Sequence, residues 1–332
     1  MKKLRTAMIG CGHFAKRHAA HLASLNQVQL VGFCDHLIEN ADAYNRQYAN
    51  GDSLVFTECE ELFAQLDLDL VYICVPPYAH QNEVELACKH GVHFLIEKPI
   101  ALSIEKAMEM YEQVRASGVK SQVGFMYRFG EAARWYKQSA SSDGRAFMTA
   151  RYACNALHSW WWRDREKSGG QLVEQVIHLL DLTRFFFGEP DQVYSLQENL
   201  FHSDVEGYSV EDASITSIRF RSGAVAAITA TNGAIPNRWD YDWRICAPGL
   251  TADFSDANHA IFHDTSQPYV STYTTVAEKD LYLAETLDLI RAIQEDCPTQ
   301  VPIEEGVRSL CLALAATESA QKNTPVNIKM PV

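Results

Sequence analysis

The chain has 332 residues, of which 47% are hydrophobic, a composition typical of globular proteins. This length predicts two domains of roughly 100 to 200 residues each. The 29 Lys and Arg against 42 Asp and Glu leave a net charge of −13, which argues against nucleic acid or an anionic membrane as a partner.

Residues 4 to 126 alternate short apolar runs with amphipathic stretches. The apolar runs include RTAMIG, VQLVGFCD, LDLVYICV and VHFLIEKP, and the stretches between them include FAKRHAAHLASL and SIEKAMEMYEQVRASG. Strands alternating with helices of this length are typical of βαβ units on a parallel sheet that is buried on both faces. We therefore predict an α/β protein in which residues 1–126 form a doubly wound domain.

Residues 127–332 have a different pattern, which predicts a second α/β domain with an open, largely antiparallel sheet. SITSIRF and GAVAAITA, joined by RSG, predict a hairpin, and RAFMTARYACNA and YDWRICAPG are also strand-like. In NRWDYDWR, alternation places Trp239, Tyr241 and Trp243 on one face, where core or oligomer interface is the preferred interpretation. Helices are expected near residues 129–140, 168–187, 279–296 and 304–321.

The nine cysteines are scattered, odd in number and without a C-x-x-C pair. This pattern favours free thiols in a reducing compartment over a disulfide framework or a zinc ribbon. No apolar run approaches the roughly 20 residues of a membrane span, and the N-terminal residues lead straight into a strand. We therefore predict a cytoplasmic protein.

A glycine motif follows the first predicted strand. Gly10, Gly12 and Ala15 form G-x-G-x-x-A at the start of a helix, with His13 and Phe14 between the second glycine and the alanine. The first glycine permits a tight turn, the second lets a pyrophosphate approach the backbone, and the small third residue lets helix and strand pack closely. All but the alanine are predicted to contact a dinucleotide at the helix N-terminus.

The second predicted strand ends in an acidic residue, Asp35, which suits the ribose hydroxyls of adenosine. A carboxylate repels a 2′-phosphate, and the next residues, His36 and Leu37, supply no Arg or Lys. NAD is therefore predicted in preference to NADP. The alternative is that Asp35 is an ordinary turn residue.

Two later strands also end in polar residues. CVPPYAH places Pro76 and His80 after one strand, and FLIEKP places Glu97 and Lys98 at the end of the next. Loops at the carboxyl ends of parallel strands line the ligand crevice, so these four residues are predicted at the cofactor, with Lys98 also catalytic. The alternative for His80 is a capping or surface histidine.

The helical stretch SGGQLVEQVIHLLDL sets Glu174, His178 and Asp181 within about 60° of arc, at about 100° per residue. The arc could be a solvated face, although it contains no Lys or Arg. A metal site is a second interpretation, but no further His or Cys lies at ligand spacing, so we predict none. The third, which we favour, is acid/base chemistry by His178 assisted by a carboxylate.

NALHSWWWRDREKSGG precedes this helix. Trp162 and Arg163 are predicted to contact substrate, the ring through apolar C–H groups and the guanidinium through hydroxyls or cofactor. The alternative is that some of the three tryptophans are core or interface residues, because at least one of three in a row must point away.

Together the motifs G-x-G-x-x-A, Asp35, CVPPYAH, EKP, VGFMYRF and SGGQLVEQVIHLLDL resemble the Gfo/Idh/MocA family in order and spacing across the chain. The resemblance implies an N-terminal Rossmann domain and a C-terminal α/β domain whose open sheet mediates homodimers or homotetramers. It implies that Lys98 contacts the substrate hydroxyl and the nicotinamide ribose, that His178 transfers the proton and that Glu174 binds substrate. Many members have Asp at that last position. Tyr127, within VGFMYRF, is included as a substrate contact, and Asp181 is expected to be mainly structural.

The sequence thus predicts an NAD-dependent oxidoreductase acting on a secondary hydroxyl of a sugar, inositol or related polyol. His178 would take the hydroxyl proton and Lys98 would stabilise the developing alkoxide, if the second domain folds over the nucleotide crevice. One alternative is a glycoside hydrolase that keeps NAD bound and acts by transient oxidation and elimination. Another is a non-catalytic NAD-binding regulatory protein.

Overall fold

The computed structural model describes residues 2–140, 144–155 and 159–332, so Ala156, at the end of the predicted strand RAFMTARYACNA, and the next two residues of NALHSWWW lie outside it. The chain divides into two compact units. One consists of Met1–Gly124 with Tyr282–Val307, and the other of Phe125–Leu281 with Arg308–Val332. The predicted domains, 1–126 and 127–332, are each continuous, whereas residues 282–307 cluster with the first unit.

The first unit is built on a six-stranded parallel sheet, which confirms the predicted doubly wound domain. Its strand order, with the first strand in the middle, is that of dinucleotide-binding Rossmann folds. In spatial order the strands are β3 (Leu54–Phe56), β2 (Val28–Cys34), β1 (Leu4–Ile9), β4 (Leu70–Ile73), β5 (His93–Ile96) and β6 (Ser121–Val123).

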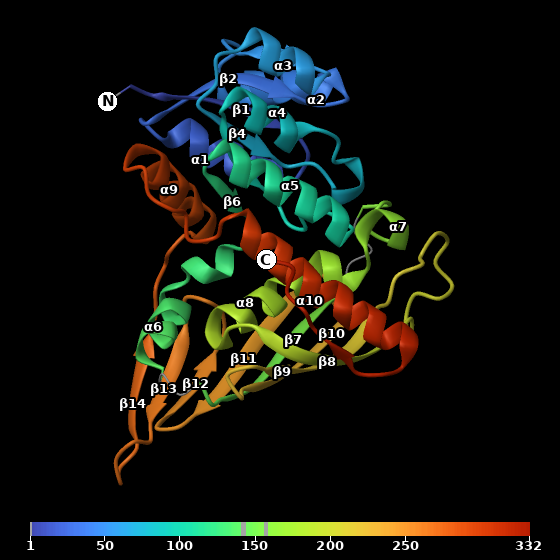
Figure 1. Ribbon diagram of the computed structural model, residues 1–332, viewed down its shortest axis with the longest axis vertical. Coiled ribbons are helices and arrows are strands. Elements are labelled where there is room, and N and C mark those ends of the chain that lie inside the picture. Colours follow the sequence, from blue (N-terminus) through green and yellow to red (C-terminus); the bar gives the residue numbers. More distant parts are fainter. Residues whose placement is uncertain (1, 141–143, 156–158) are drawn as a thin grey trace. The chain divides into compact units, whose positions relative to one another are not determined.

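Helices cover both faces of this sheet (Figure 1). They are α1 (Ala15–Ser24), α2 (Ile38–Tyr48), α3 (Cys59–Gln65), α4 (Glu83–His90), α5 (Ile104–Ser117) and α9 (Leu281–Gln294), with a short 3₁₀ turn at Pro77–Ala79. Apolar residues of α1, α2 and α9 form one buried cluster with side chains of β1, β2, β4 and β5, including Met8, Phe33 and Tyr72. From α9 this cluster takes Leu289 and Ile290, so a distant segment completes the Rossmann core.

The second unit is built on a nine-stranded sheet that is antiparallel except where β7 and β10 run parallel. This confirms the predicted open, largely antiparallel sheet. The predicted hairpin is confirmed as β9 and β10. In spatial order the strands are β14 (Ser271–Thr275), β13 (Ala260–Asp264), β12 (Leu250–Phe254), β11 (Trp239–Ala247), β7 (Phe147–Asn155), β10 (Val225–Pro236), β9 (Ala213–Phe220), β8 (Pro190–Glu198) and β15 (Val326–Asn327).

Helices of the second unit lie over one face of its sheet (Figure 1). They are a 3₁₀ turn at Met126–Phe129, α6 (Glu131–Ser139), α7 (Arg165–Ser168), a π-turn at Leu172–Val176 and α8 (Ile177–Phe187). The boundary between the two units falls within α10 (Ile303–Lys322). Phe187 of α8 packs on Phe220 of β9 with ring centroids 5.4 Å apart. Across the described ranges, no helix has the length and apolar character that crossing a bilayer requires.

The cysteines are free thiols, as predicted, although their burial varies and Cys246 is exposed. Burial, followed by the Asp35 carboxylate, raises the pKa of the Cys11 thiol, and burial followed by Glu97 raises that of Cys74. Because both groups stay protonated near neutral pH, neither is suited to act as a nucleophile or a metal ligand without a partner that removes its proton.

Candidate active site

The glycine loop joins β1 to α1 and is tied to the end of β2. Gly10 has a φ of +86°, and a Cβ there would lie 2.5 Å from the carbonyl oxygen of Cys74. Only glycine fits this turn. The backbone N–H of Cys11 then donates to Oδ2 of Asp35 at 2.8 Å, and the Tyr44 hydroxyl donates to the Gly12 carbonyl at 2.5 Å.

The N-terminal end of α1 suits the pyrophosphate of a dinucleotide. Within the described residues no side chain caps this end, and the first turn carries no acidic residue. A Cβ added at Gly12 would meet no atom within 4 Å. Packing within the protein therefore gives no reason for glycine at this position, whereas close approach of a phosphate does. His13 and Phe14 are both exposed beside it, Phe14 to 55%.

Asp35 lies where the predicted ribose contact requires, immediately after β2. Its side chain is largely buried and fixed by the protein, since Oδ1 accepts from the Leu37 N–H at 3.0 Å and from the Asn40 amide at 3.1 Å. These contacts fix the carboxylate next to the glycine loop. Asp35 therefore also has a structural part in shaping the loop, beyond the ribose contact that the sequence predicts.

The loop after β4 carries Pro76 and His80. His80 follows the 3₁₀ turn and stands three residues before α4. Its imidazole is almost fully buried, and Nδ1 lies 3.7 Å from a carboxylate oxygen of Glu83. His80 is thus oriented by the first turn of α4 and is not a freely solvated surface histidine.

Glu97 and Lys98 follow β5 directly, and Glu97 is the better fixed of the two. Its Oε1 lies 2.7 Å from Nε2 of His18, and its Oε2 accepts from the Lys98 backbone N–H at 3.2 Å. A Cβ on Gly124 would lie 2.7 Å from the same carboxylate, so that glycine leaves room for it. Lys98 itself is half-buried.

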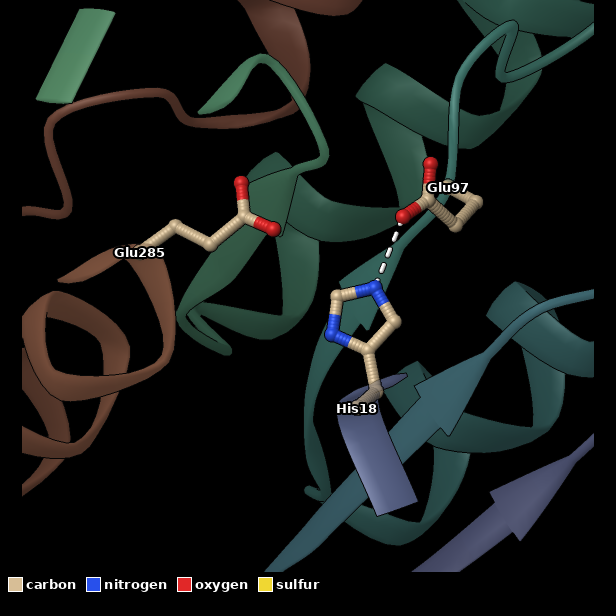
Figure 2. A group of neighbouring side chains, drawn as sticks. All are labelled: His18, Glu97 and Glu285. Atoms are coloured by element: carbon tan, nitrogen blue, oxygen red, sulfur yellow. Dashed lines mark hydrogen bonds and ion pairs between the residues drawn. The ribbon is translucent and has the colours of Figure 1, made fainter. Parts of the chain in front are cut away.

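His18 lies on α1, with two carboxylates near its ring (Figure 2). Its ring packs between Tyr72 and Tyr282, with centroids 5.3 and 5.7 Å away. Figure 2 shows the Glu97 carboxylate at one side of the ring and the Glu285 carboxylate, from α9, at another. One ligating atom from each of His18, Glu97 and Glu285 lies within 4.8 Å of the others.

Within the described ranges, the His18, Glu97 and Glu285 group is the set that could hold a metal ion by donor type and distance. The 2.7 Å hydrogen bond between His18 and Glu97 already engages one atom of each, and we interpret the group as a buried hydrogen-bonded pair with the Glu285 carboxylate nearby. The hydrogen bond ties α1 to the residue that precedes Lys98. The sequence did not indicate Glu285, because it stands far along the chain in a helix with no motif.

Two of the predicted site residues, His178 and Tyr127, lie in contact within the second unit. Their ring centroids are 5.3 Å apart, and Phe125 meets His178 edge-on at 6.2 Å. Tyr241 of β11 packs against Tyr127 with its ring tilted, the centroids being 5.4 Å apart. Trp243 is buried, as the core interpretation of that strand expects, but Tyr241 borders the His178 cluster. Sequence alternation could not show this, because it depends on which strands pair.

Glu174 lies in the π-turn that precedes α8, where the sequence predicted one continuous helix from residue 168 to 187. π-Turns within helices are frequent at functional sites. The Trp162 indole Nε1–H donates to Oε2 of Glu174 at 2.6 Å, and the indole is 2% exposed. The predicted pair of substrate residues is thus in direct contact, and the tryptophan is part of the protein interior.

The other two residues of interest have clear structural contacts. The Arg163 carbonyl accepts from the Ser209 N–H at 2.8 Å, while its side chain is partly exposed. Asp181 accepts two hydrogen bonds from Arg128, at 2.8 and 2.6 Å, and a third from Ser309 at 2.8 Å. The residues that donate these three hydrogen bonds all belong to the second unit, which fits a structural role for Asp181.

Both halves of the chain match profiles of one protein family. Residues 4–125 match the oxidoreductase family's NAD-binding Rossmann fold, and residues 145–328 match its C-terminal alpha/beta domain. The chain belongs to the Gfo/Idh/MocA oxidoreductase family. It is thus a member of an oxidoreductase family, and its N-terminal domain is of the type that binds NAD.

Relatives of this family member include sugar and inositol enzymes. It is 28% identical to D-glucoside 3-dehydrogenase of Escherichia coli over 67% of this chain and 68% of that protein. It is 23% identical to myo-inositol 2-dehydrogenase of Thermotoga maritima over 98% of this chain and 99% of the relative. Levoglucosan dehydrogenase in complex with NADH has the same fold, with a TM-score of 0.90 at 20% identity, covering 99% of this chain and 100% of that one.

Proposed function

We propose that this family member is an NAD-dependent dehydrogenase that oxidises a secondary hydroxyl of a sugar, inositol or related polyol, or reduces the corresponding ketone. The observation that carries the proposal is the cluster around His178. A nearly buried imidazole lies beside Tyr127 on the helix that follows Glu174, in a chain whose other unit has a dinucleotide loop. The named relatives, which act on glucosides and inositol, support this substrate class.

In this proposal His178 accepts the proton of the substrate hydroxyl, and the Lys98 ammonium stabilises the negative charge that develops on that oxygen. Glu174 accepts a hydrogen bond from a neighbouring hydroxyl. The predicted substrate contacts of Tyr127 and Arg163 remain part of the proposal. NAD, when bound, supplies the hydride acceptor, and it would be held by the Gly10–Phe14 loop, Asp35, Pro76, His80 and the Glu97–Lys98 segment.

We propose NAD as the cofactor in preference to NADP, because the Asp35 carboxylate is held in a fixed position. An anion at this position repels a 2′-phosphate, and the residues that follow, His36 and Leu37, supply no permanent positive charge. The Asn40 amide and two backbone N–H groups already orient the carboxylate, so it cannot turn away without losing them.

The test is NADH formation, followed by absorbance, across a panel of monosaccharides, glycosides, inositols and sugar acids with NAD and NADP in parallel. On the best substrate, Lys98→Met and His178→Asn should each lower kcat/KM by about 10²- to 10³-fold, because each removes a group used in the transition state. Lys106→Met is the matched control, since that lysine is 43% exposed on α5 and forms an ion pair with Glu109 at 3.6 Å.

Near-wild-type turnover by Lys98→Met would contradict the proposal. Release of an aglycone from a glycoside without net NADH would identify the elimination chemistry of a glycoside hydrolase instead. Tight NADH binding with no turnover across the panel would point to a regulatory protein.

A further inference from the structure

We propose that Trp162 is a positioning residue, whose indole N–H fixes the Glu174 carboxylate and so sets where a substrate hydroxyl is held. The inference rests on the proposed function, because it takes Glu174 as the substrate-binding carboxylate. Its basis is one contact, the 2.6 Å hydrogen bond from Nε1 to Oε2. Hydrogen bonds to an ionised carboxylate are short and about twice as strong as those between neutral groups.

The tryptophan is itself held firmly. Its ring is 2% exposed and meets Tyr208 edge-on, with centroids 6.2 Å apart, in a small buried cluster with Val210. Tyr208 in turn stacks on His202, whose backbone N–H and imidazole both contact Asp212. The Trp162 indole is thus fixed by a packed cluster, so its N–H determines the orientation of the Glu174 carboxylate.

The backbone that carries Glu174 is equally fixed. Gly170 has a φ of +98°, and a Cβ there would lie 2.7 Å from the Glu211 carboxylate, so the chain passes too close for any side chain. Glu211 binds Arg165 at 2.6 Å and accepts from the Leu172 N–H at 3.1 Å. The start of the turn is thus anchored, and the Trp162 bond restricts the torsions of the Glu174 side chain.

Glutamate and tryptophan are matched in length here. Aspartate, which the resemblance identifies as the more usual residue, would draw the carboxylate back by about one C–C bond, or about 1.5 Å. From 2.6 Å, that retreat takes the acceptor beyond hydrogen-bonding distance of Nε1. We infer that the longer side chain places the carboxylate oxygens deeper in the site than aspartate would, in an orientation that depends on Trp162.

The first arm of the test needs no substrate. In protein labelled with ¹⁵N at the indole nitrogens, Trp162→Phe identifies the Trp162 signal among six tryptophans by its loss. We expect that proton resonance to lie downfield, and Glu174→Gln and Glu174→Asp to move it toward the position of an ordinary indole. A Trp162 signal unchanged in both Glu174 variants would overturn the inference, and the Glu174 variants decide it even if Trp162→Phe does not fold.

The second arm measures kinetics, with myo-inositol and methyl β-D-glucoside as probes. Trp162→Phe should raise the KM for the sugar or polyol by about 10- to 100-fold while the KM for NAD stays unchanged. Combined with Glu174→Asp it should cause little further loss, because either change breaks the same contact. Trp160→Phe, in a ring that is 63% exposed, is the matched control.

Independent, multiplying effects of Trp162→Phe and Glu174→Asp would overturn the inference, as would an equal rise in both KM values. If wild-type protein oxidises neither probe nor any compound of the wider panel, the proposed function fails. The indole signal still decides whether Trp162 fixes Glu174, so the two failures remain distinct.

Discussion

At the scale of single residues, Gly10 and Gly12 of the dinucleotide loop are glycine for different reasons. Gly10 adopts a backbone conformation with positive φ, and the Cys74 carbonyl leaves no room for a Cβ. Gly12 has open space where a Cβ would point. The first glycine is therefore required by the fold, and the second by whatever approaches the loop from outside.

Alanine at each position should separate these roles. Gly12→Ala should melt at the wild-type temperature yet bind NADH at least about tenfold more weakly, equivalent to about 1.4 kcal/mol, because the methyl group occupies the path of the pyrophosphate. Gly10→Ala should lose about 2 kcal/mol or more of unfolding free energy, since its Cβ meets backbone. Thermal melting and NADH titration measure both. Equal destabilisation by the two substitutions would show that Gly12 also serves the fold.

The residues that the sequence singles out lie in motifs, whereas residues such as Tyr241 are defined by packing and carry no such signal. Gly10, Gly12, Asp35 and Lys98 are recognisable because strand ends and glycine turns carry local signals. Tyr241 reaches Tyr127 only through the pairing of β11 with β7, and a one-residue change of register would turn it to the other face. No local pattern contains that information.

At the scale of secondary-structure elements, the predicted helix at residues 168–187 is in fact interrupted. Gly169 and Gly170, both with positive φ, separate α7 from the π-turn, and α8 begins at Ile177. Helical and π periodicities cannot be told apart over a few apolar residues, so the wheel drawn at 100° per residue misplaces Glu174 relative to His178. Alternation of strands and helices, a longer-range signal, predicted the Rossmann sheet correctly.

The pair that holds α8 to the 3₁₀ turn at Met126–Phe129 should be important for stability. Arg128 and Asp181 are both buried, and Arg184 lies 3.9 Å from the same carboxylate. Asp181→Ala should therefore lower the unfolding free energy by about 3 to 5 kcal/mol, because guanidinium charge stays buried without its partner. Asp191→Ala breaks a comparable contact with Arg219 at 2.9 Å, but both side chains there are about half exposed, so a loss of about 0 to 1 kcal/mol is expected.

Denaturant unfolding of the two variants side by side measures the contrast. If Asp181→Ala costs no more than Asp191→Ala, the buried pair does not stabilise the second unit, and the structural role expected for Asp181 is lost.

At the scale of the whole molecule, the face of the nine-stranded sheet opposite its helices carries exposed apolar side chains. Leu196 and Ile215 stand directly opposite each other on β8 and β9 and are 48% and 54% exposed. Exposed apolar side chains also lie on β7, β10 and β13, at Phe147, Val225 and Ile261. Exposed apolar surface of this kind commonly marks protein–protein contacts, which agrees with the predicted homodimer or homotetramer.

Ile215→Asp should shift the protein toward the monomer in sedimentation velocity, because it places a charge in the apolar contact. Its melting temperature at low protein concentration should change little, since the residue is exposed. Leu54→Asp, at a residue 51% exposed on β3 of the other unit, is the control and should leave the association state unchanged. A wild-type protein that stays monomeric at high concentration would remove the basis of this expectation.

The contribution of α9 to the first unit has a consequence for synthesis. The ribosome makes the chain from its N-terminus, so strands β1 to β6 emerge long before Leu289, Ile290 and Glu285 exist. Until then the nascent Rossmann sheet has part of its core uncovered, and His18 and Glu97 lack their third neighbour. The dinucleotide domain is the first to be translated, yet its core is complete only after α9 has been made. We therefore expect the nascent chain to bind cofactor only once most of it has been synthesised.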